Sequence, residues 1–203
     1  MANKNNSGGL PEWVGSGWLL AGFTLISVFL LALTYEGTRD QIAAQEKRIL
    51  EEQLTQLLPV GSFDNDPTTD ILEIPTDKKT IYRARKQDQP VAALIKTTAP
   101  DGYNGSILLL VGIRVDGSLL GVRAIFHKET PGLGDEIDLR KSDWILGFKN
   151  HSLSNPEPDQ WKVKKDGGIF DAFTGATITP RAVVRETKDT LIYFRQHKAE
   201  LFK

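Results

Sequence analysis

The longest hydrophobic run of the chain lies near its N-terminus. No charged residue occurs between Trp13 and Tyr35. A helix that crosses a bilayer needs about 20 predominantly apolar residues, and tryptophan and tyrosine favour its two interfaces. The pattern therefore predicts a single transmembrane helix over residues 17–35, which follows an N-terminal tail formed by residues 1–16.

A cleaved signal peptide is the alternative for this segment, because Ala32 and Thr34 form a weak small-x-small pattern. The run exceeds the roughly 7–15 apolar residues typical of a signal peptide, and Lys4 is the only basic residue before it. Both features favour a permanent anchor. Arg39 and Lys47 follow the span, and this small excess of positive charge favours a cytoplasmic C-terminal domain. Long domains cross membranes despite such a bias, so the charges leave the orientation open.

A second hydrophobic pattern, with helical spacing, follows the apolar run. Its members are Ile42, Ile49, Leu50, Leu54, Leu57 and Leu58. Pro59 and Gly61 end it, since neither residue continues a helix well. We expect this helix to prolong the membrane helix as a stalk, and residues 61–79, rich in Asp, Thr and Pro, to form a linker. The stalk and the linker together occupy residues 36–79.

From about residue 80 the hydrophobic pattern changes to that of β-strands. Four β-rich runs occur, which are TIYRARK (80–86), PVAALIKTT (90–98), SILLLVGIRV (106–115) and SLLGVRAIFH (118–127). Turn residues separate them, including Asp116-Gly117, a pair that favours a type I′ hairpin. The short connections predict an antiparallel meander.

The rest of the chain combines helical and strand patterns. LRKSDWILGF (139–148) predicts a short helix, and QWKVKK (160–165) predicts a further strand. The last helix is expected to begin with Thr179 as its N-cap and Pro180 as its first residue. Residues 80–203 therefore predict an α+β domain in which helices cover a meander sheet.

Composition and charge exclude several kinds of function. The net charge is −1, so we expect no nucleic-acid partner. The chain contains no cysteine, which rules out disulfides, thiolate metal sites and cysteine nucleophiles. Its histidines, His127, His151 and His197, lie too far apart in the sequence for a ligand motif, and we expect no metal site.

The segment DAFTGATITPRAVV (171–184) holds three threonines beside the start of the last helix. Thr179 is explained as the cap, and Thr174 is well placed for a local hydroxyl turn. Thr177 has no such explanation. It follows a glycine and an alanine and lies just outside a helix N-terminus, where free N–H groups favour an anion. On these residues alone, a phosphate-related role and a plain structural role both stay open.

The run Asp171–Thr177 matches the D-x-x-[ST]-G-A-T motif of covalent flavinylation, in which the last threonine carries FMN through a phosphoester bond. Three segments extend the match, which are TAPDGYNG (98–105), HKETPGLGDEIDLRKSDWI (127–145) and WKVKKDGGIFDAFTGATITPRAVV (161–184). Together they resemble the G-subunit family of the Rnf electron-transport complexes, over about residues 80–185. The single N-terminal span fits that family as well.

The resemblance implies that Thr177 is the FMN attachment site and that Asp171, Thr174, Gly175 and Ala176 form its recognition sequence. It also implies a separate Mg²⁺-dependent flavin transferase, which moves FMN from FAD onto the hydroxyl. Small neighbours give a second enzyme access to this threonine.

By the same resemblance, the chain is a membrane-anchored electron carrier in an ion-translocating oxidoreductase. Its partners are other membrane and redox subunits of the complex. The family places the FMN-binding domain, here residues 80–203, on the periplasmic side of the bacterial inner membrane. Because the sequence shows no paired acid and base groups, we expect no complete catalytic site on this chain alone.

The segment ETPGLG (129–134) has two interpretations. Pro131-Gly132 suits the central positions of a type II turn after a strand. The resemblance makes the segment a candidate loop against the flavin, with backbone N–H groups at the polar edge of the ring and a leucine at its face. The candidate residues are Thr130, Gly132, Leu133 and Gly134.

Four further charged or titratable residues are assigned less sharply. His127 and Glu129 are candidates for modulating proton uptake if the loop contacts the flavin. Lys164 and Lys165 lie either near the phosphate or at a solvated strand end.

Two alternative functions stay open. The C subunit of the sodium-pumping NADH:quinone oxidoreductase shares the fold and the motif, but residues 121–185 match the Rnf family more tightly. A flavin-binding sensor that passes no electrons onward has the same anchor and domain. Co-purification with integral-membrane redox subunits distinguishes such a sensor from an electron carrier.

Overall fold

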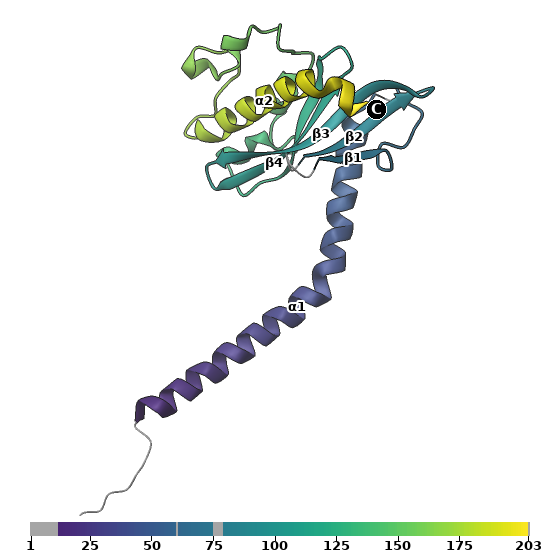
Figure 1. Ribbon diagram of the computed structural model, residues 1–203. Helices are drawn as coiled ribbons and strands as arrows, with labels where there is room; N and C mark the ends of the chain where they lie inside the picture. The colour runs from purple at the N-terminus through teal and green to yellow at the C-terminus, as the bar shows by residue number, and fades with distance from the viewer. Residues whose placement is uncertain (1–11, 60, 75–78, 203) are drawn as a thin grey trace, which may run out of the picture. The chain divides into compact units, whose positions relative to one another are not determined.

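The computed structural model describes residues 12–59, 61–74 and 79–202. They divide into two compact units, one ending at Arg48 and the other beginning at Ile49. The helices and strands of the described residues (Figure 1) are α1 (Glu12–Leu57), β1 (Ile71–Ile74), β2 (Lys79–Lys86), β3 (Gln89–Gly102), β4 (Gly105–Arg114), β5 (Leu119–Phe126), the short 3₁₀-helices η2 (Gly134–Ile137), η3 (Asp143–Phe148), η4 (Pro158–Gln160) and η5 (Lys164–Asp166), and α2 (Ile178–Leu201).

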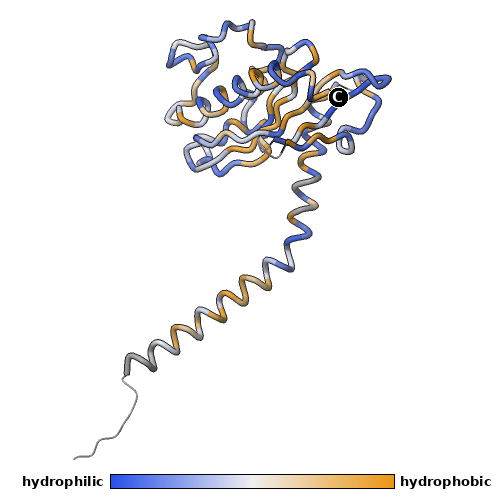
Figure 2. Tube along the Cα trace, viewed as in Figure 1, coloured by the Kyte–Doolittle hydropathy of each residue, from blue (hydrophilic) through white to orange (hydrophobic). Residues whose placement is uncertain are grey.

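Helix α1 is continuous from the apolar segment into the expected stalk. Its part from Gly17 to Ile42 is long and apolar enough to cross a membrane, as its hydrophobic colouring in Figure 2 shows. None of its most apolar window is buried within the protein. The helix ends at Leu57, two residues before Pro59, because proline has no N–H to continue the hydrogen-bond ladder. One helix therefore covers both the predicted membrane segment and the predicted stalk.

The five strands form one antiparallel sheet in the order β1-β2-β3-β4-β5. This arrangement confirms the predicted meander of four strands and adds one strand at its edge. Strand β1 lies within residues 61–79, which we expected to be a linker, and it pairs Ile71 with Tyr82. Four residues are too few to show a clear alternation, so the sequence pattern alone does not reveal this edge strand.

Two hairpin turns show how local chemistry sets the sheet register. Gln87 and Asp88, between β2 and β3, both have positive φ, as a type I′ turn requires. The type I′ prediction at Asp116-Gly117 is wrong, because Gly117 has a φ of 90° but Asp116 does not have positive φ. There the Asp116 carboxylate accepts the Ser118 N–H at 2.8 Å, which stabilises a connection with a left-handed glycine.

Both faces of the sheet are buried, because successive residues of the central strands point to opposite sides. On one face, Ile81, Ile95 and Val111 pack in a cluster with Val183 and Phe194 of α2 (Figure 1). On the other face, Tyr82, Leu94 and Leu110 pack in a cluster with Leu54 and Leu57 of the last turns of α1. The predicted α+β fold, in which helices cover a meander sheet, is confirmed.

The segment between β5 and α2 has little regular structure and is held by aromatic side chains. The predicted short helix is present as η3, whose Ser142 cap accepts the Trp144 N–H. The predicted strand over residues 160–165 is wrong. Only Val163 forms a bridge, with Phe170, because the chain turns back at Gly167 (φ 84°) before a longer strand can pair.

Candidate functional site

Thr177 lies at the N-cap position of α2, but its side chain makes no capping hydrogen bond. Thr179 is instead the second residue of the helix and is fully buried, and Pro180 is the third. The predictions of Thr179 as the cap and Pro180 as the first helical residue are therefore wrong. Proline is tolerated at the third position, since the first four N–H groups of a helix have no partner within it.

A tertiary contact explains why Thr179 does not cap. Its hydroxyl donates a short hydrogen bond to Oε2 of Glu129, a residue only 5 % exposed. The other carboxylate oxygen of Glu129 accepts the Asn104 N–H at 3.1 Å. A buried carboxylate needs such donors, so satisfying Glu129 outweighs the smaller gain from capping. The Thr177 hydroxyl, at the N-cap position, makes no hydrogen bond to the backbone N–H groups of the helix either.

The residues before Thr177 form a tight turn. Ala176 N–H donates to the Phe173 carbonyl at 3.2 Å, and Gly175 has a φ of 81°, which glycine adopts at least cost. Phe173 is buried and packs edge-to-face on Trp144, with ring centroids 5.0 Å apart. This anchor leaves Thr174 and Gly175 exposed and Ala176 and Thr177 half-buried.

The ETPGLG segment forms the predicted turn after β5. Leu133 N–H donates to the Thr130 carbonyl at 3.1 Å, and Gly132 has a φ of 77°. Gly134 N–H reaches the same carbonyl, and Gly132 N–H donates to Asp135 Oδ1 at 2.7 Å. Three backbone N–H groups expected at a flavin edge are thus engaged within the loop. The side chain of Leu133, 42 % exposed, is the part that the loop presents outward.

The two sequence motifs meet at one cavity of about 330 Å³. Its lining consists of Tyr103, Glu129, Thr130, Leu133, Gly134, Gly175, Ala176, Thr177, Ile178 and Thr179. A Cβ on Gly134 would lie 2.8 Å from Glu129 Oε2 and from Thr179 Oγ1. Glycine at this position therefore lets the loop close on the Thr179–Glu129 contact beside the cavity.

Other candidate residues lie outside this lining. Asp171 forms an exposed ion pair with Lys164 at 2.6 Å, and its carbonyl accepts the Trp144 indole N–H at 2.8 Å. His127 Nδ1 accepts the Glu129 N–H at 3.3 Å, which orients the start of the loop. Among the described residues that line the cavity, neither His127 nor Lys165 is present.

Sequence reasoning missed Arg181, which contacts Thr177. Its Nη1 donates to Thr177 Oγ1 at 3.3 Å, and its Nε and Nη2 donate to the two oxygens of Asp166 at 2.6 Å each. The spacing of four residues between Thr177 and Arg181 was the available signal, because it places both on one face of a helix. These hydrogen bonds hold the pKa of Asp166 below its ordinary value and raise the pKa of Arg181.

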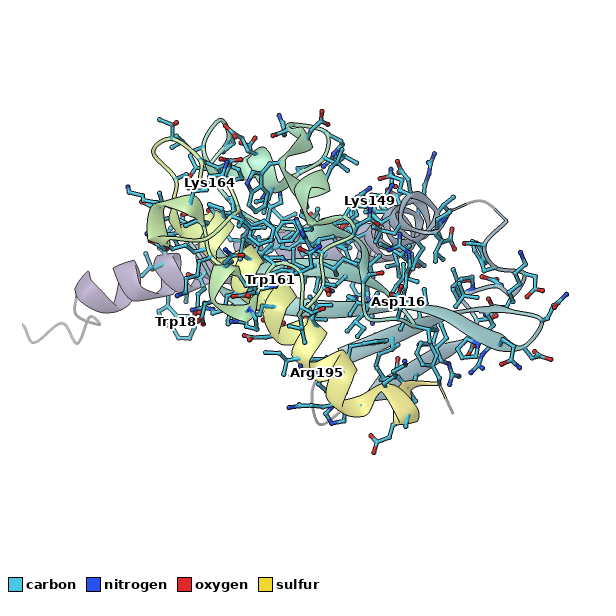
Figure 3. The ribbon with its side chains drawn as sticks, turned by 90° about the horizontal axis from the view of Figure 1, so that it is seen from above. Trp18, Asp116, Lys149, Trp161, Lys164 and Arg195 are labelled. Carbon is cyan, nitrogen blue, oxygen red and sulfur yellow. The ribbon has the colours of Figure 1, made fainter. Side chains whose placement is uncertain are left out.

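A larger hollow, of about 490 Å³, lies between the β4–β5 hairpin and the second half of α2. Asp116 and Arg195 are among its lining residues, and Figure 3 labels both, with Arg195 on α2. It contains neither of the two motifs. The smaller cavity beside Thr177 is therefore the candidate functional site.

Comparison with known proteins identifies the parts of the chain. Residues 14–57 match the family model described as RnfG N-terminal region, and residues 102–192 match the FMN-binding domain. The FMN-binding match contains the cavity and both of its motifs.

Relatives that match nearly the whole chain are described as the G subunit of an ion-translocating oxidoreductase complex. The relative from Pseudoalteromonas atlantica is 48 % identical and covers 92 % of this chain and 90 % of its own length. A relative from Vibrio cholerae is 48 % identical with 92 % of each chain covered, and one from Shewanella amazonensis is 46 % identical over 93 % of this chain and 91 % of its own. With its N-terminal region, its FMN-binding domain and this identity along nearly its whole length, the chain belongs to the Rnf-type family of G subunits of ion-translocating oxidoreductase complexes.

Proposed function

We propose that this chain is the membrane-anchored electron-transfer subunit of an Rnf-type ion-translocating oxidoreductase and carries FMN covalently, through its phosphate, on Thr177. The observation that carries the proposal is the Thr177 hydroxyl, which makes no capping hydrogen bond and lies at the wall of the cavity. Thr179, the neighbouring hydroxyl, is buried and committed to Glu129. Only the first of these two threonines is open to a second enzyme.

The cavity suits a flavin in size and chemistry. Its volume of about 330 Å³ lies in the range of small-molecule sites, which combine an apolar lining with a few polar groups. Leu133, Ile178 and Tyr103 offer exposed apolar or aromatic surface at its rim. A phosphate on Thr177 would lie at the N-terminus of α2, where the helix dipole favours negative charge.

FMN supplies the redox chemistry, and the chain holds and tunes it. Thr177 fixes the phosphate end, while the 130–134 loop limits access of water to the apolar rim. Asp171, Thr174, Gly175 and Ala176 form the turn that a flavin transferase recognises. The chain transfers electrons between partner subunits and has no complete catalytic site of its own.

The same proposal includes location and domain division. The tail (1–16) precedes a single membrane span (17–35), and the stalk and linker (36–79) lead to the FMN-binding domain (80–203). The span lies in the bacterial inner membrane with the domain in the periplasm. Protease added to spheroplasts should then digest the domain, and protection until lysis would place the flavin in the cytoplasm.

Intact mass of the protein tests the attachment. Protein made with a flavin transferase should be heavier than its sequence by FMN less one water and should fluoresce on a denaturing gel. Thr177→Ala should lose both signals completely, because no acceptor oxygen remains, and should unfold at the temperature of the wild type.

Thr177→Ser and Thr174→Ala are the matched controls. The serine variant keeps a hydroxyl at the same position and should be labelled at least in part. The Thr174→Ala variant keeps the acceptor hydroxyl but alters the recognised turn, so it should reach the same labelled mass more slowly than the wild type. Covalent flavin on Thr177→Ala protein would move the attachment to another residue.

A further inference from the structure

Arg181 is the cationic residue that hydrogen-bonds to the proposed acceptor hydroxyl of Thr177. Its Nη1 donates to Thr177 Oγ1 at 3.3 Å from one turn further along α2. A hydroxyl that accepts from a guanidinium has its own proton turned away from that donor. The contact also favours negative charge on the oxygen, because the guanidinium stays positive at all relevant pH values.

Asp166 fixes the orientation of this guanidinium. It is the last residue of η5 and accepts from Nε and Nη2, which occupy one edge of the planar group. The third nitrogen, Nη1, is thereby directed to Thr177. A bidentate pair of this kind restricts both distance and angle, whereas a lysine would contribute only a mobile point charge.

Two neighbouring basic residues form ion pairs with other carboxylates. Lys164 pairs with Asp171 at 2.6 Å, and Arg185, one turn after Arg181, pairs with Asp101. The Arg181 side chain is 42 % exposed, so it can follow the hydroxyl into the cleft of another protein. Of the cationic residues that the structure describes, Arg181 thus contacts the acceptor oxygen and is also held in place by Asp166.

We propose that Arg181, oriented by Asp166, positions the Thr177 hydroxyl for flavin transfer and then holds the phosphodiester that forms. The inference rests on the proposed function of Thr177. In the transfer, the Thr177 oxygen forms a bond to the FMN phosphorus of FAD, and the bond from that phosphorus to the bridging oxygen breaks. AMP leaves with the bonding electrons, the hydroxyl proton passes to a base of the transferase or to water, and nothing is oxidised or reduced.

The rate of transfer to the full-length protein in detergent tests this role. Purified protein without flavin is mixed with FAD, Mg²⁺ and flavin transferase, and the labelled fraction is followed by intact mass. Arg181→Gln should lower the rate at saturating protein roughly tenfold, the effect of losing one charge-assisted hydrogen bond. The protein concentration that gives half the maximal rate should change little, because the contact orients the hydroxyl rather than binding the transferase.

Three further variants separate positioning from general charge. Arg181→Lys should recover part of the rate, and Asp166→Asn should lower it by about threefold, since the guanidinium loses its orienting partner. The double variant should be no slower than Arg181→Gln, because Asp166 acts only through Arg181. Arg185→Gln, which removes the same charge one turn away, should react at the wild-type rate.

Each other outcome overturns the inference. Equal rates for wild type and Arg181→Gln remove the role, and equal losses in Arg181→Gln and Arg185→Gln assign the effect to the summed charge of the helix. Thermal unfolding of the unlabelled variants identifies a folding defect, in which case Arg181→Lys and Asp166→Asn decide. If wild type is not labelled, or Thr177→Ala is, the proposed function itself fails.

Discussion

Helix α2 is joined to the rest of its unit by two hydroxyl–carboxylate contacts, one buried and one partly buried, that differ in charge balance. At its start, Thr179 donates to Glu129, which has no cation within ion-pair distance in the described part of the chain. In its middle, Glu186 accepts from Thr97, and Lys79 lies 3.6 Å from the same carboxylate oxygen. The first contact depends on hydrogen bonds alone, and the second also contains an ion pair.

This difference in charge balance indicates that the middle of α2 serves stability and that its start serves function. In the middle contact, Lys79 Nζ also donates to Thr97 at 2.6 Å and lies 5.3 Å from the Tyr193 ring centroid, so its charge is satisfied in several ways. At the start, a carboxylate without a counter-ion lies beside a cavity. An uncompensated buried charge costs stability, and proteins tolerate such costs mainly at functional sites.

Removing the donor hydroxyl should have the largest effect on stability at the start of the helix. Thr179→Val keeps the shape but leaves Glu129 Oε2 buried without its donor, and we expect a loss of about 2–3 kcal/mol in the free energy of unfolding. Thr97→Val, the matched change in the middle contact, should cost about 1 kcal/mol, because Lys79 and Glu186 can still pair. Urea unfolding of both variants measures the difference, and equal losses would remove the distinction between the contacts.

Neutralising the carboxylates should reverse that order. Glu186→Gln leaves the Lys79 charge without its counter-ion. The side chains of Lys79 and Glu186 are only 16 % and 15 % exposed, so we expect a loss of about 2 kcal/mol in the free energy of unfolding. Glu129→Gln should cost less than about 1 kcal/mol, since its amide keeps an acceptor for Asn104 and the Thr179 hydroxyl can turn to accept. A Glu129→Gln variant less stable than Glu186→Gln would show that the first contact includes a cation.

The smallest effect is expected from the exposed pair on the outer side of the helix start. Arg181 lowers the pKa of Asp166, so the pair stabilises the fold above the unfolded carboxyl pKa of about 4 and ceases to do so as pH falls through the lowered native value. Both side chains are exposed, and solvent screens the interaction. Wild type and Asp166→Asn should therefore differ only slightly at pH 7. In unfolding measured across pH, the difference should shrink as pH falls below about 4 and vanish below the lowered native pKa.

The fold was largely predictable where the sequence repeats a signal. Alternating residues such as Ile81-Tyr82 and Leu94-Ile95 predicted strands, and the structure buries their two sets on opposite faces. Short elements were less predictable. Strand β1 has only four residues, and residues 160–165 have strand-like composition but no extended neighbour with which to pair.

The candidate site was predictable as a set of residues but not as a geometry. The spare hydroxyl of Thr177 and the glycine-containing turn at Gly132 were both visible in the sequence. Their meeting at one cavity was not, because about 40 residues of irregular chain separate the two motifs. The hydrogen bond from Thr179 to Glu129 depends on the same approach of the two segments, and it removed Thr179 from the capping role expected of it.

By itself, the sequence determined the membrane-length helix, the meander, the turn at Pro131-Gly132 and the motif that ends at Thr177. Each of these depends on neighbouring residues, through hydrophobic periodicity or through the φ angles that glycine permits. The tertiary structure alone decided which hydroxyl is buried, which backbone N–H groups are engaged and which cation reaches Thr177. These outcomes depend on desolvation and on partners distant in the chain, because a buried polar group must find its hydrogen bonds wherever the fold supplies them.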